Sequence, residues 1–445
     1  MSGLLLQAWA RTLRRRGGDI AAVSAANGQR VTFRELDRRA TTWLEKHIPD
    51  PGAQAGRAAL FAAPNGIGWL EIFLGLLKAG VVAVPLDAAE PLAAQRRLAE
   101  SLLAGFWWDG TQLVPLAGAR RYRDPEVCLI KLTSGTTGQP KSLVFTSAQL
   151  ISDARQVTAT MGIGPRDLNY ALIPLGHSYG LGNLTVPLLA QGVPLVCGTA
   201  PLPHAIAADF KRWRPTVFPG VPVMWRALAA SDVRLDSLRL GISAGAPLPP
   251  EVARDFAARF GRRLHGFYGS SETGGIAYDA AGRATLDGGV GLAMCGVKLN
   301  QLRGQRLLVG SAAVFTHGNR RGQKGLGTWL MPDRVALDSR GGLTLLGRRG
   351  TTVKITGRRV NLAEVTARLR RLPGVRDAWV GVSGGATDAT LGAVVVTERP
   401  VAELRAALQA DTAVWKIPKK WIIVAALPLT DRGKADTRAL QAMIG

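Results

Sequence analysis

The stretch Leu132–Ser142 constrains this chain most, because it joins an apolar run to a loop rich in small polar residues. The run Val127–Ile130 before it is typical of a buried strand. Three hydroxyl side chains, two glycines and a lysine then follow between Ser134 and Lys141. Such a loop can turn backbone N–H groups and hydroxyls toward one anion, and the lysine adds a positive charge for a phosphate. A flexible turn between two strands is the alternative interpretation.

Strand and helix patterns alternate before this loop. Thr32 is an expected helix N-cap with Glu35 three residues later, and residues 58–61 are typical of a short buried strand. Residues 69–78 have the apolar spacing of a helix, which ends before a strand at residues 81–84. This alternation predicts an α/β fold with a parallel sheet and helices on its faces.

Length and composition bound the class of protein. The 445 residues are enough for two or three domains, and the 53 glycines and 25 prolines suit an α/β enzyme with many tight turns. Cys128, Cys197 and Cys295 are widely spaced, which indicates neither a disulfide framework nor a zinc site. We expect all three to be reduced residues of the core.

The chain shows no obvious membrane or export segment. The most apolar stretch, Ile67–Leu86, is interrupted by Glu71, Lys78 and Pro85, so we expect no membrane span. The N-terminal residues 4–13 predict an amphipathic helix, and the arginines that follow the leucines reverse the order of a signal peptide. We therefore expect a soluble, cytoplasmic protein.

The formal net charge of +24 is spread along the whole chain in arginine pairs such as Arg38-Arg39 and Arg262-Arg263. A nucleic-acid-binding protein tends to concentrate its charge on one arm or face, so we expect no specific nucleic-acid partner. A solvated basic surface is one interpretation of this charge. Attraction to an acidic protein, a phosphate-bearing molecule or an anionic membrane surface is the other.

The loop is not a Walker A loop, because Pro140 precedes Lys141 where that pattern has Gly-Lys-Ser/Thr. Its order Thr-Ser-Gly-Thr-Thr-Gly-x-Pro-Lys instead resembles the phosphate loop of the adenylate-forming superfamily, which includes acyl- and aryl-CoA synthetases, peptide-synthetase adenylation domains and luciferases. The segment Leu77–Asp87 resembles another signature of that superfamily, with a structural role. By this resemblance the β- and γ-phosphates of ATP are bound by Thr133, Ser134, Gly135, Thr136, Thr137, Gly138 and Lys141.

Two further segments resemble the nucleotide site of that superfamily. The turn after Leu240–Ser243 resembles the one beside adenine, at Gly245, Ala246 and Pro247. Residues 266–275 resemble the Tyr-Gly-x-Thr-Glu motif. The resemblance places Tyr268 and Gly269 at adenine, Ser271 at the α-phosphate and Glu272 on Mg²⁺, which usually takes only one or two protein carboxylates beside phosphates. A surface carboxylate is the alternative for Glu272.

His177 lies in a segment that resembles the boundary between acyl pocket and thiol tunnel in that superfamily. A hydrogen-bonded core histidine is the alternative. Adenylation domains for α-amino acids place an aspartate here to pair the substrate ammonium, and Gly176-His177-Ser178 offers none. Because burying an unpaired ammonium is costly, we expect a carboxylic acid substrate other than an α-amino acid.

The remaining signals lie toward the C-terminus. Asp333 stands in an imperfect match to the family's Thr-Gly-Asp region, and the resemblance assigns it to the ribose hydroxyls. Residues 347–365 resemble the crossover between the two domains of the family, or they form a hairpin with a basic turn. By the resemblance Arg348 contacts ribose, Gly350 is the hinge and Gly357 lines the pantetheine tunnel.

The pattern Pro-x-Thr-x-x-Gly-Lys in residues 428–434 matches the family's catalytic lysine at Lys434. Its ammonium would bridge carboxylate and α-phosphate oxygens as negative charge shifts in the transition state. A solvated loop lysine is the alternative. The resemblance thus implies three catalytic residues: Lys434, Glu272 and His177.

The resemblance runs from about Thr32 to Arg438 and is strongest to AMP-dependent acyl-CoA synthetases. It implies an N-terminal adenylation domain over residues 1–346, built from parallel-type sheets with flanking helices, and a small mobile α+β domain over residues 347–445. It also implies ATP-dependent conversion of a carboxylic acid to an acyl-adenylate with release of pyrophosphate, followed by transfer to a phosphopantetheine thiol. The expected cofactors are ATP, Mg²⁺ and coenzyme A or phosphopantetheine.

Three other functions remain open from the sequence. An acyl-AMP ligase could load an acidic acyl carrier protein, which the positive charge favours. A luciferase-like oxidase would share the motifs. A degenerate ATP- or nucleic-acid-binding protein would not need the intact Lys141, Glu272, Asp333, Arg348 and Lys434. The small residues Gly180, Gly182, Gly274 and Gly275 near the expected acyl pocket predict room for a bulky acyl or aryl chain.

Overall fold

The computed structural model describes residues 3–133, 141–315, 327–348, 352–355, 358–384, 390–409, 412, 416–430 and 434–445. The chain forms two compact units. The first comprises Met1–Asn300, Leu308–Trp329 and Asp338–Leu343, and the second comprises Gln301–Leu307, Leu330–Leu337 and Thr344–Gly445. The division into domains at residues 346 and 347 stays a prediction.

The larger sheet of the first unit has nine strands within the described residues, in the order β15-β14-β13-β12-β11-β9-β10-β1-β2. Six neighbouring strands, from β13 to β1, run parallel, and antiparallel partners lie at both edges. This confirms the expected α/β fold with a parallel sheet. The strands are β1 (Ile20–Ser24), β2 (Arg30–Thr32), β9 (Asn169–Ala171), β10 (Leu195–Cys197), β11 (Val217–Gly220), β12 (Leu240–Ser243), β13 (Leu264–Ser270), β14 (Gly274–Tyr278) and β15 (Leu292–Ala293).

A second sheet of this unit has the order β6-β5-β3-β4-β7-β8. Its strands β5, β3, β4 and β7 are parallel, while β6 and β8 pair antiparallel at the edges. The two strands predicted at residues 58–61 and 81–84 are confirmed as β3 and β4. The strands are β3 (Ala58–Ala62), β4 (Val82–Leu86), β5 (Phe106–Trp108), β6 (Leu113–Pro115), β7 (Val127–Thr133) and β8 (Lys141–Thr146).

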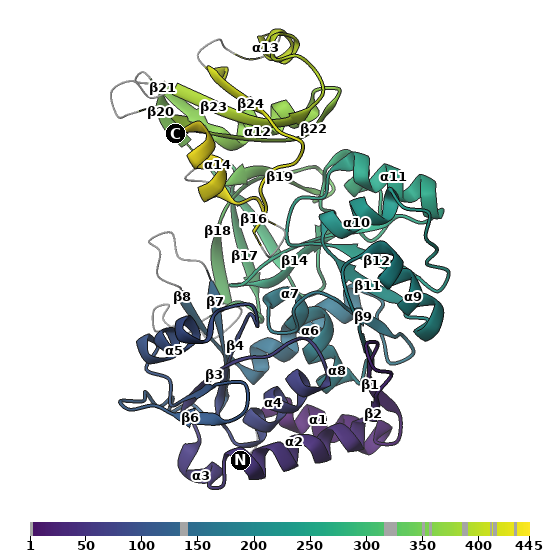
Figure 1. The fold of residues 1–445 in the computed structure, drawn as a ribbon, viewed down its shortest axis with the longest axis vertical. Helices are drawn as coiled ribbons and strands as arrows, with labels where there is room; N and C mark the ends of the chain where they lie inside the picture. The colour runs from purple at the N-terminus through teal and green to yellow at the C-terminus, as the bar shows by residue number, and fades with distance from the viewer. Residues whose placement is uncertain are drawn as a thin grey trace. The chain divides into compact units, whose positions relative to one another are not determined.

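Helices surround these two sheets, and α1, α2 and α4 lie side by side at one end of the unit (Figure 1). Thr32 caps α2 as predicted, because its hydroxyl accepts a hydrogen bond from the Glu35 N–H at 3.1 Å. The helices are α1 (Leu4–Arg16), α2 (Phe33–His47), α3 (Pro51–Gln54), α4 (Ile67–Lys78), α5 (Leu92–Ser101), α6 (Ser147–Met161), α7 (Ser178–Gly180), α8 (Val186–Gln191), α9 (Pro203–Trp213), α10 (Pro222–Ala229) and α11 (Pro250–Phe260), with a π-helix η1 (Leu181–Thr185) and a 3₁₀ helix η2 (Ala284–Asp287).

The largest hydrophobic cluster takes residues from both sheets and from helices α1, α2, α4, α6 and α8. Helix α4 is apolar on nearly all sides because it lies inside this cluster, where Phe73 and Leu74 are fully buried. Cys128 and Cys197 are buried as expected. Cys295 is exposed, so its prediction as a core residue was wrong.

The second unit is an α+β structure. Its described three-stranded sheet has the order β22-β23-β24, with β22 and β23 antiparallel. Its elements are the hairpin β20 (Thr352–Ile355) and β21 (Arg358–Asn361), α12 (Leu362–Arg371), β22 (Val375–Ser383), β23 (Thr390–Thr397), α13 (Val401–Gln409), β24 (Lys420–Ile423) and α14 (Thr437–Ile444). The residues of a further sheet are divided between the two units, and this sheet consists of β16 (Lys298–Leu302), β17 (Arg306–Ser311), β18 (Gly327–Leu337) and β19 (Leu343–Arg348).

None of the helices in the described part of the chain is long and apolar enough to span a bilayer.

Candidate active site

The phosphate loop joins two paired strands. β7 ends at Thr133 and β8 begins at Lys141, and these two residues are antiparallel partners, so the ends of the loop are held together. The predicted phosphate-binding residues Ser134, Gly135, Thr136, Thr137 and Gly138 lie outside the described residues, as does the side chain of Lys141.

The predicted adenine residues lie at the C-terminal ends of two neighbouring parallel strands, after β12 and within the last residues of β13. β12 ends at Ser243, which pairs with Gly266 of β13, so the turn Gly245–Pro247 and the residues Tyr268 and Gly269 lie at the same edge of the sheet. Ligands of open parallel sheets bind at this carboxyl edge. Gly245 has φ = 84°, in the left-handed region that a side chain disfavours. The structure therefore brings these predicted residues together.

The turn that carries Ser271 and Glu272 is fixed by backbone hydrogen bonds. The Ser270 hydroxyl accepts from the N–H groups of Glu272 and Thr273, each at 3.2 Å. The Glu272 carbonyl accepts from the Phe315 N–H at 2.7 Å. Ser271 and Glu272 are half-buried. The backbone of this turn is therefore held on both sides, while Ser271 and Glu272 stay partly exposed to solvent.

His177 lies next to the same turn. It is the residue before α7, and the next residue, Ser178, donates a hydrogen bond from its hydroxyl to the Ser271 hydroxyl at 3.1 Å. Nε2 of His177 lies 3.8 Å from Oδ2 of Asp87, which follows β4. Three segments thus meet here: the end of β4, the start of α7 and the Ser271 turn.

Sequence reasoning missed Asp87 and Lys131 as neighbours of the site. Asp87 is the last residue of the segment Leu77–Asp87, to which the resemblance assigned a structural role. Lys131 is 4% exposed and stands in the otherwise apolar strand β7, which was its only sequence signal. Burial lowers the pKa of Lys131, while the carboxylates of Asp153 and Glu272 raise it. The structure thus adds a buried lysine that interacts electrostatically with the predicted metal carboxylate, Glu272, and whose pKa burial lowers overall.

The second unit carries the other predicted residues. Asp333 lies on β18 and is 8% exposed. Arg348 ends β19, but its side chain lies outside the described residues, as does all of Gly357. Lys434 is exposed, and its carbonyl accepts hydrogen bonds from the N–H and hydroxyl of Thr430 at 2.7 and 3.2 Å.

The four glycines near the acyl pocket do not provide the room predicted for a bulky acyl chain. A Cβ at any of them would overlap protein atoms. These atoms are the Pro174 carbonyl for Gly180, the Asp153 carboxylate for Gly182 and Gly274, and the Met294 sulfur for Gly275. The absent side chains therefore make space for neighbouring parts of the protein, and the prediction was wrong at these positions.

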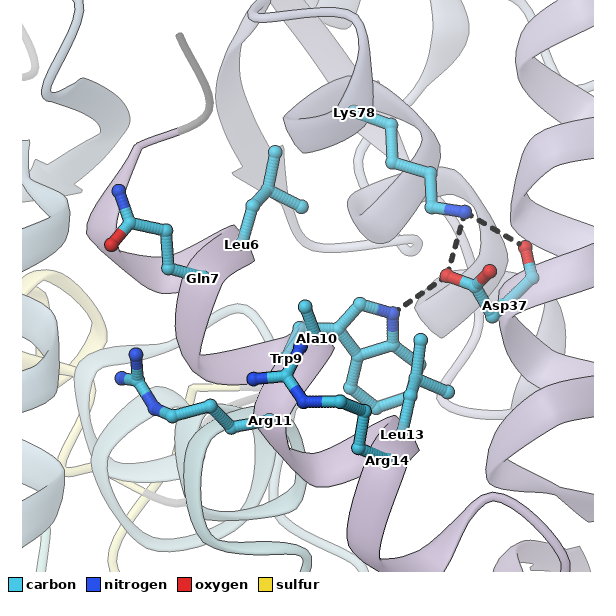
Figure 2. Close-up of a pocket in the computed structure, with 9 residues that line it drawn as sticks. All are labelled: Leu6, Gln7, Trp9, Ala10, Arg11, Leu13, Arg14, Asp37 and Lys78. Atoms are coloured by element: carbon cyan, nitrogen blue, oxygen red, sulfur yellow. Dashed lines mark hydrogen bonds and ion pairs between the residues drawn. The ribbon is translucent and has the colours of Figure 1, made fainter.

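A cavity of about 470 Å³ lies elsewhere, against α1, α2 and α4, and contains none of the predicted site residues (Figure 2). Figure 2 shows Lys78 and Trp9 both pointing at Asp37. Their nitrogens lie 2.6 and 2.7 Å from its Oδ1. These three polar groups satisfy one another, while the side chains of Gln7, Arg11 and Arg14 also line the cavity.

The family model described as AMP-binding enzyme matches residues 9–105 and 109–306. The chain belongs to the AMP-binding enzyme family. A feruloyl-CoA synthase from Amycolatopsis sp is 26% identical over 92% of each protein. A probable 2-succinylbenzoate–CoA ligase from Mycobacterium tuberculosis is 31% identical, over 74% of this chain and 88% of that protein. The resemblance to the adenylate-forming superfamily is confirmed.

The fold agrees with this assignment. Klebsiella oxytoca NpsA, solved in complex with 3-hydroxyanthranilyl-AMSN, superposes with a TM-score of 0.85 at 18% identity, over 100% of this chain and 99% of that chain. The enzyme is an AMP-forming acid–thiol ligase of the acyl-CoA synthetase type, which uses ATP to activate a carboxylic acid.

The residues of this ligase are suited to a Mg²⁺ ion that is bound by a protein carboxylate together with phosphate oxygens. Within the described residues, no three His, Cys, Asp or Glu side chains gather into a metal-binding group. A cation that bridges phosphates needs only one or two protein carboxylates, and Glu272 offers one on a turn whose backbone is fixed.

Proposed function

We propose that this ligase converts an aromatic carboxylic acid to its coenzyme A thioester. The observation that carries the proposal is the Ser178–Ser271 hydrogen bond, because it joins the segment assigned to the acyl side with the one assigned to the α-phosphate. The feruloyl and 2-succinylbenzoate groups named for the two relatives support an aromatic acid. The rings of Tyr179 and Phe267, with centroids 5.6 Å apart, place two aromatic side chains beside this junction.

ATP is the substrate that the carboxyl edge of β12 and β13 would receive. Tyr268 and Gly269, with Gly245, Ala246 and Pro247, would pack on adenine, and Ser271 would contact the α-phosphate. Asp333 and Arg348 would hold the ribose. The residues Thr133–Gly138 and Lys141 would bind the β- and γ-phosphates. The hydrogen bonds that hold the backbone of the Ser271 turn support the assignment, because catalysis of adenylation depends mainly on positioning and charge.

Glu272 would hold Mg²⁺ together with the phosphates. When bound, the ion neutralises phosphate charge and orients the leaving pyrophosphate. His177 would line the passage between acyl pocket and thiol tunnel, and Asp87 at 3.8 Å would orient its ring. Lys434 would bridge the substrate carboxylate and the α-phosphate during adenylation.

Residues 347–445 would form a mobile domain that turns about Gly350 between the two half-reactions. In the second state the loop at Gly357 would face the pantetheine arm of coenzyme A. A glycine absorbs such a backbone rotation without steric cost. The free thiols of the chain fit a reducing compartment, which supports a cytoplasmic location.

An acidic acyl carrier protein is the second candidate acceptor, favoured by the net charge of +24. Product analysis separates the two. The enzyme is incubated with ATP, Mg²⁺, a panel of aryl acids and either coenzyme A or a phosphopantetheinylated carrier protein. The proposal predicts AMP and an aryl-CoA thioester. Thioester formed only on the carrier protein would make the second candidate correct.

The Lys434→Ala variant tests whether this lysine acts in only one of the two half-reactions. We expect Lys434→Ala to abolish acyl-adenylate formation, because the charge that stabilises the transition state is lost, while thioester formation from supplied acyl-adenylate continues. The rates of both half-reactions are measured separately. Lys419→Ala, at another exposed lysine of the second unit, is the control and should change neither rate. Equal loss of both half-reactions in Lys434→Ala would show that the assignment is wrong.

A further inference from the structure

Helix α6 presents a buried polar face toward the segments around Glu272. Gln149, Asp153 and Gln156 are spaced four and three residues apart, which places them on one side of the helix, and all are less than 10% exposed. Each side chain holds a different piece of chain. Gln149 donates to the Val314 carbonyl at 2.9 Å, Asp153 accepts from the Gly275 N–H at 2.9 Å, and Gln156 donates to the Ser311 hydroxyl at 3.0 Å.

Of the three side chains, Asp153 binds the residue that lies nearest in sequence to Glu272. It binds Gly275, three residues after Glu272. Its carboxylate also occupies the space next to Gly182 and Gly274, where a Cβ would overlap it. The two glycines therefore allow a buried carboxylate to reach the backbone of the turn. Among the glycines near the acyl pocket, these two are explained by Asp153.

Lys131 brings the opposite charge to this region. It lies two residues before Thr133, where the phosphate loop begins, and it is 4% exposed. Its ammonium lies 4.1 Å from the centre of the Phe145 ring, a distance suited to a cation–π contact. The carboxylates of Asp153 and Glu272 both act on it electrostatically.

The contacts continue from Lys131 to the turn. The Phe145 ring packs against the Phe315 ring with centroids 5.9 Å apart, and the Phe315 N–H donates to the Glu272 carbonyl at 2.7 Å. Lys131 thus reaches the turn through two aromatic rings, and Asp153 reaches it through Gly275. Both residues are therefore linked to the turn that carries the proposed ligand of Mg²⁺.

We propose that Asp153 and Lys131 are positioning residues that hold the Glu272 turn in the geometry that binds MgATP. The inference rests on the proposed function. Burial disfavours the charged form of both side chains, because it raises the pKa of Asp153 and lowers that of Lys131. An apolar pair of similar size is often as stable, so stability alone is a weak reason for them. Asp153 binds the backbone at Gly275, and Lys131 packs on Phe145, whose ring contacts the ring of the residue that donates to the Glu272 carbonyl. These links supply another reason, because a carboxylate that binds a cation must be held in a narrow range of orientations.

The test measures how far MgATP raises the melting temperature, because a ligand that binds only the folded state stabilises it according to its affinity. Asp153→Ala removes the acceptor of the Gly275 N–H together with the charge. We expect it to raise the MgATP concentration for half-maximal stabilisation about tenfold or more, a loss of about 1.4 kcal/mol. Asp153→Asn keeps an acceptor oxygen and should show a smaller loss.

Asp209 provides a matched control. It is 6% exposed and accepts hydrogen bonds from the Tyr170 hydroxyl at 2.6 Å and the Thr199 N–H at 3.2 Å, and none of these groups belongs to the proposed site. Asp209→Ala should lower the melting temperature without changing the MgATP dependence. If Asp153→Ala behaves like Asp209→Ala, the positioning role is wrong.

The double variant Lys131→Met with Asp153→Asn separates folding from positioning. It removes both charges, so its melting temperature without ligand should exceed that of Lys131→Met alone, in which Asp153 lacks its counter-charge. Its MgATP response should stay weak. A wild-type response in the double variant would overturn the inference while leaving the proposed function intact. A wild-type enzyme that gains no stability from MgATP would contradict the proposed function and this inference together.

Discussion

Ser178 is a single residue whose role can be measured directly. Its hydroxyl donates to Ser271 at 3.1 Å, which leaves the Ser271 proton available for a phosphate oxygen. A neutral hydrogen bond contributes about 0.5–1.5 kcal/mol, so Ser178→Ala should slow pyrophosphate exchange by about two- to tenfold. Ser152→Ala is the control, because this half-buried serine of α6 donates its hydroxyl to the Ala148 carbonyl of the same helix. An unchanged exchange rate in Ser178→Ala would contradict the assignment of Ser271.

The reactivity of each cysteine thiol measures whether that residue is buried. Burial raises the pKa of Cys128 and of Cys197 to about 12, so both thiols stay protonated and shielded at pH 8, well below that value. Cys295 is exposed. A thiol reagent at pH 8 should therefore modify one cysteine in the native protein and three after denaturation. Cys295→Ser should leave no rapidly reacting thiol. Rapid modification of two or three thiols in the native wild type would contradict this burial pattern.

At the residue scale the sequence predicted roles where motif order was available, as for Ser271 and Glu272. It did not predict Asp87 or Lys131, because their importance comes from burial and from partners distant in the chain. The glycines at 182 and 274 were misinterpreted for the same reason. A missing side chain shows that space is needed, but the sequence does not say whether protein or substrate fills it, and here the Asp153 carboxylate does.

At the scale of elements the N-cap of α2 gives a quantitative prediction. The Thr32 hydroxyl accepts from the Glu35 N–H at 3.1 Å, and losing such a cap costs about 0.5–2 kcal/mol. Thr32→Ala should lower the free energy of unfolding by that amount in urea denaturation. Thr42→Ala, at an exposed position inside the same helix, should be neutral or slightly stabilising. Equal effects of the two substitutions would show that the cap contributes nothing.

Elements with strong local signals were predictable, and irregular ones were not. The alternation of apolar runs located β3, α4 and β4 to within about two residues, because each has a regular period bounded by turn residues. The π-helix η1 had no such signal. It lies between α7 and α8, where the Gly180 backbone passes close to the Pro174 carbonyl, a contact that depends on tertiary packing.

At the scale of the whole molecule the order of motifs along the chain predicted the family. Glu272 lies in the first compact unit, and Asp333 and Lys434 lie in the second. The proposed reaction therefore needs both units, and its two half-reactions would use different faces of the second. The sequence could not show which carboxylic acid is the substrate, because the shape of the acyl pocket depends on how distant segments pack.

The central claim is that this enzyme adenylates an aromatic acid, and exchange of labelled pyrophosphate into ATP without any thiol tests it most directly. The measurement compares aryl, fatty, hydroxy and α-amino acids, with Glu272→Gln as the inactive reference. The account predicts exchange that depends on an aryl acid and on Mg²⁺, and none with α-amino acids. Absence of exchange with every aryl acid, from an enzyme that still binds MgATP, would contradict it.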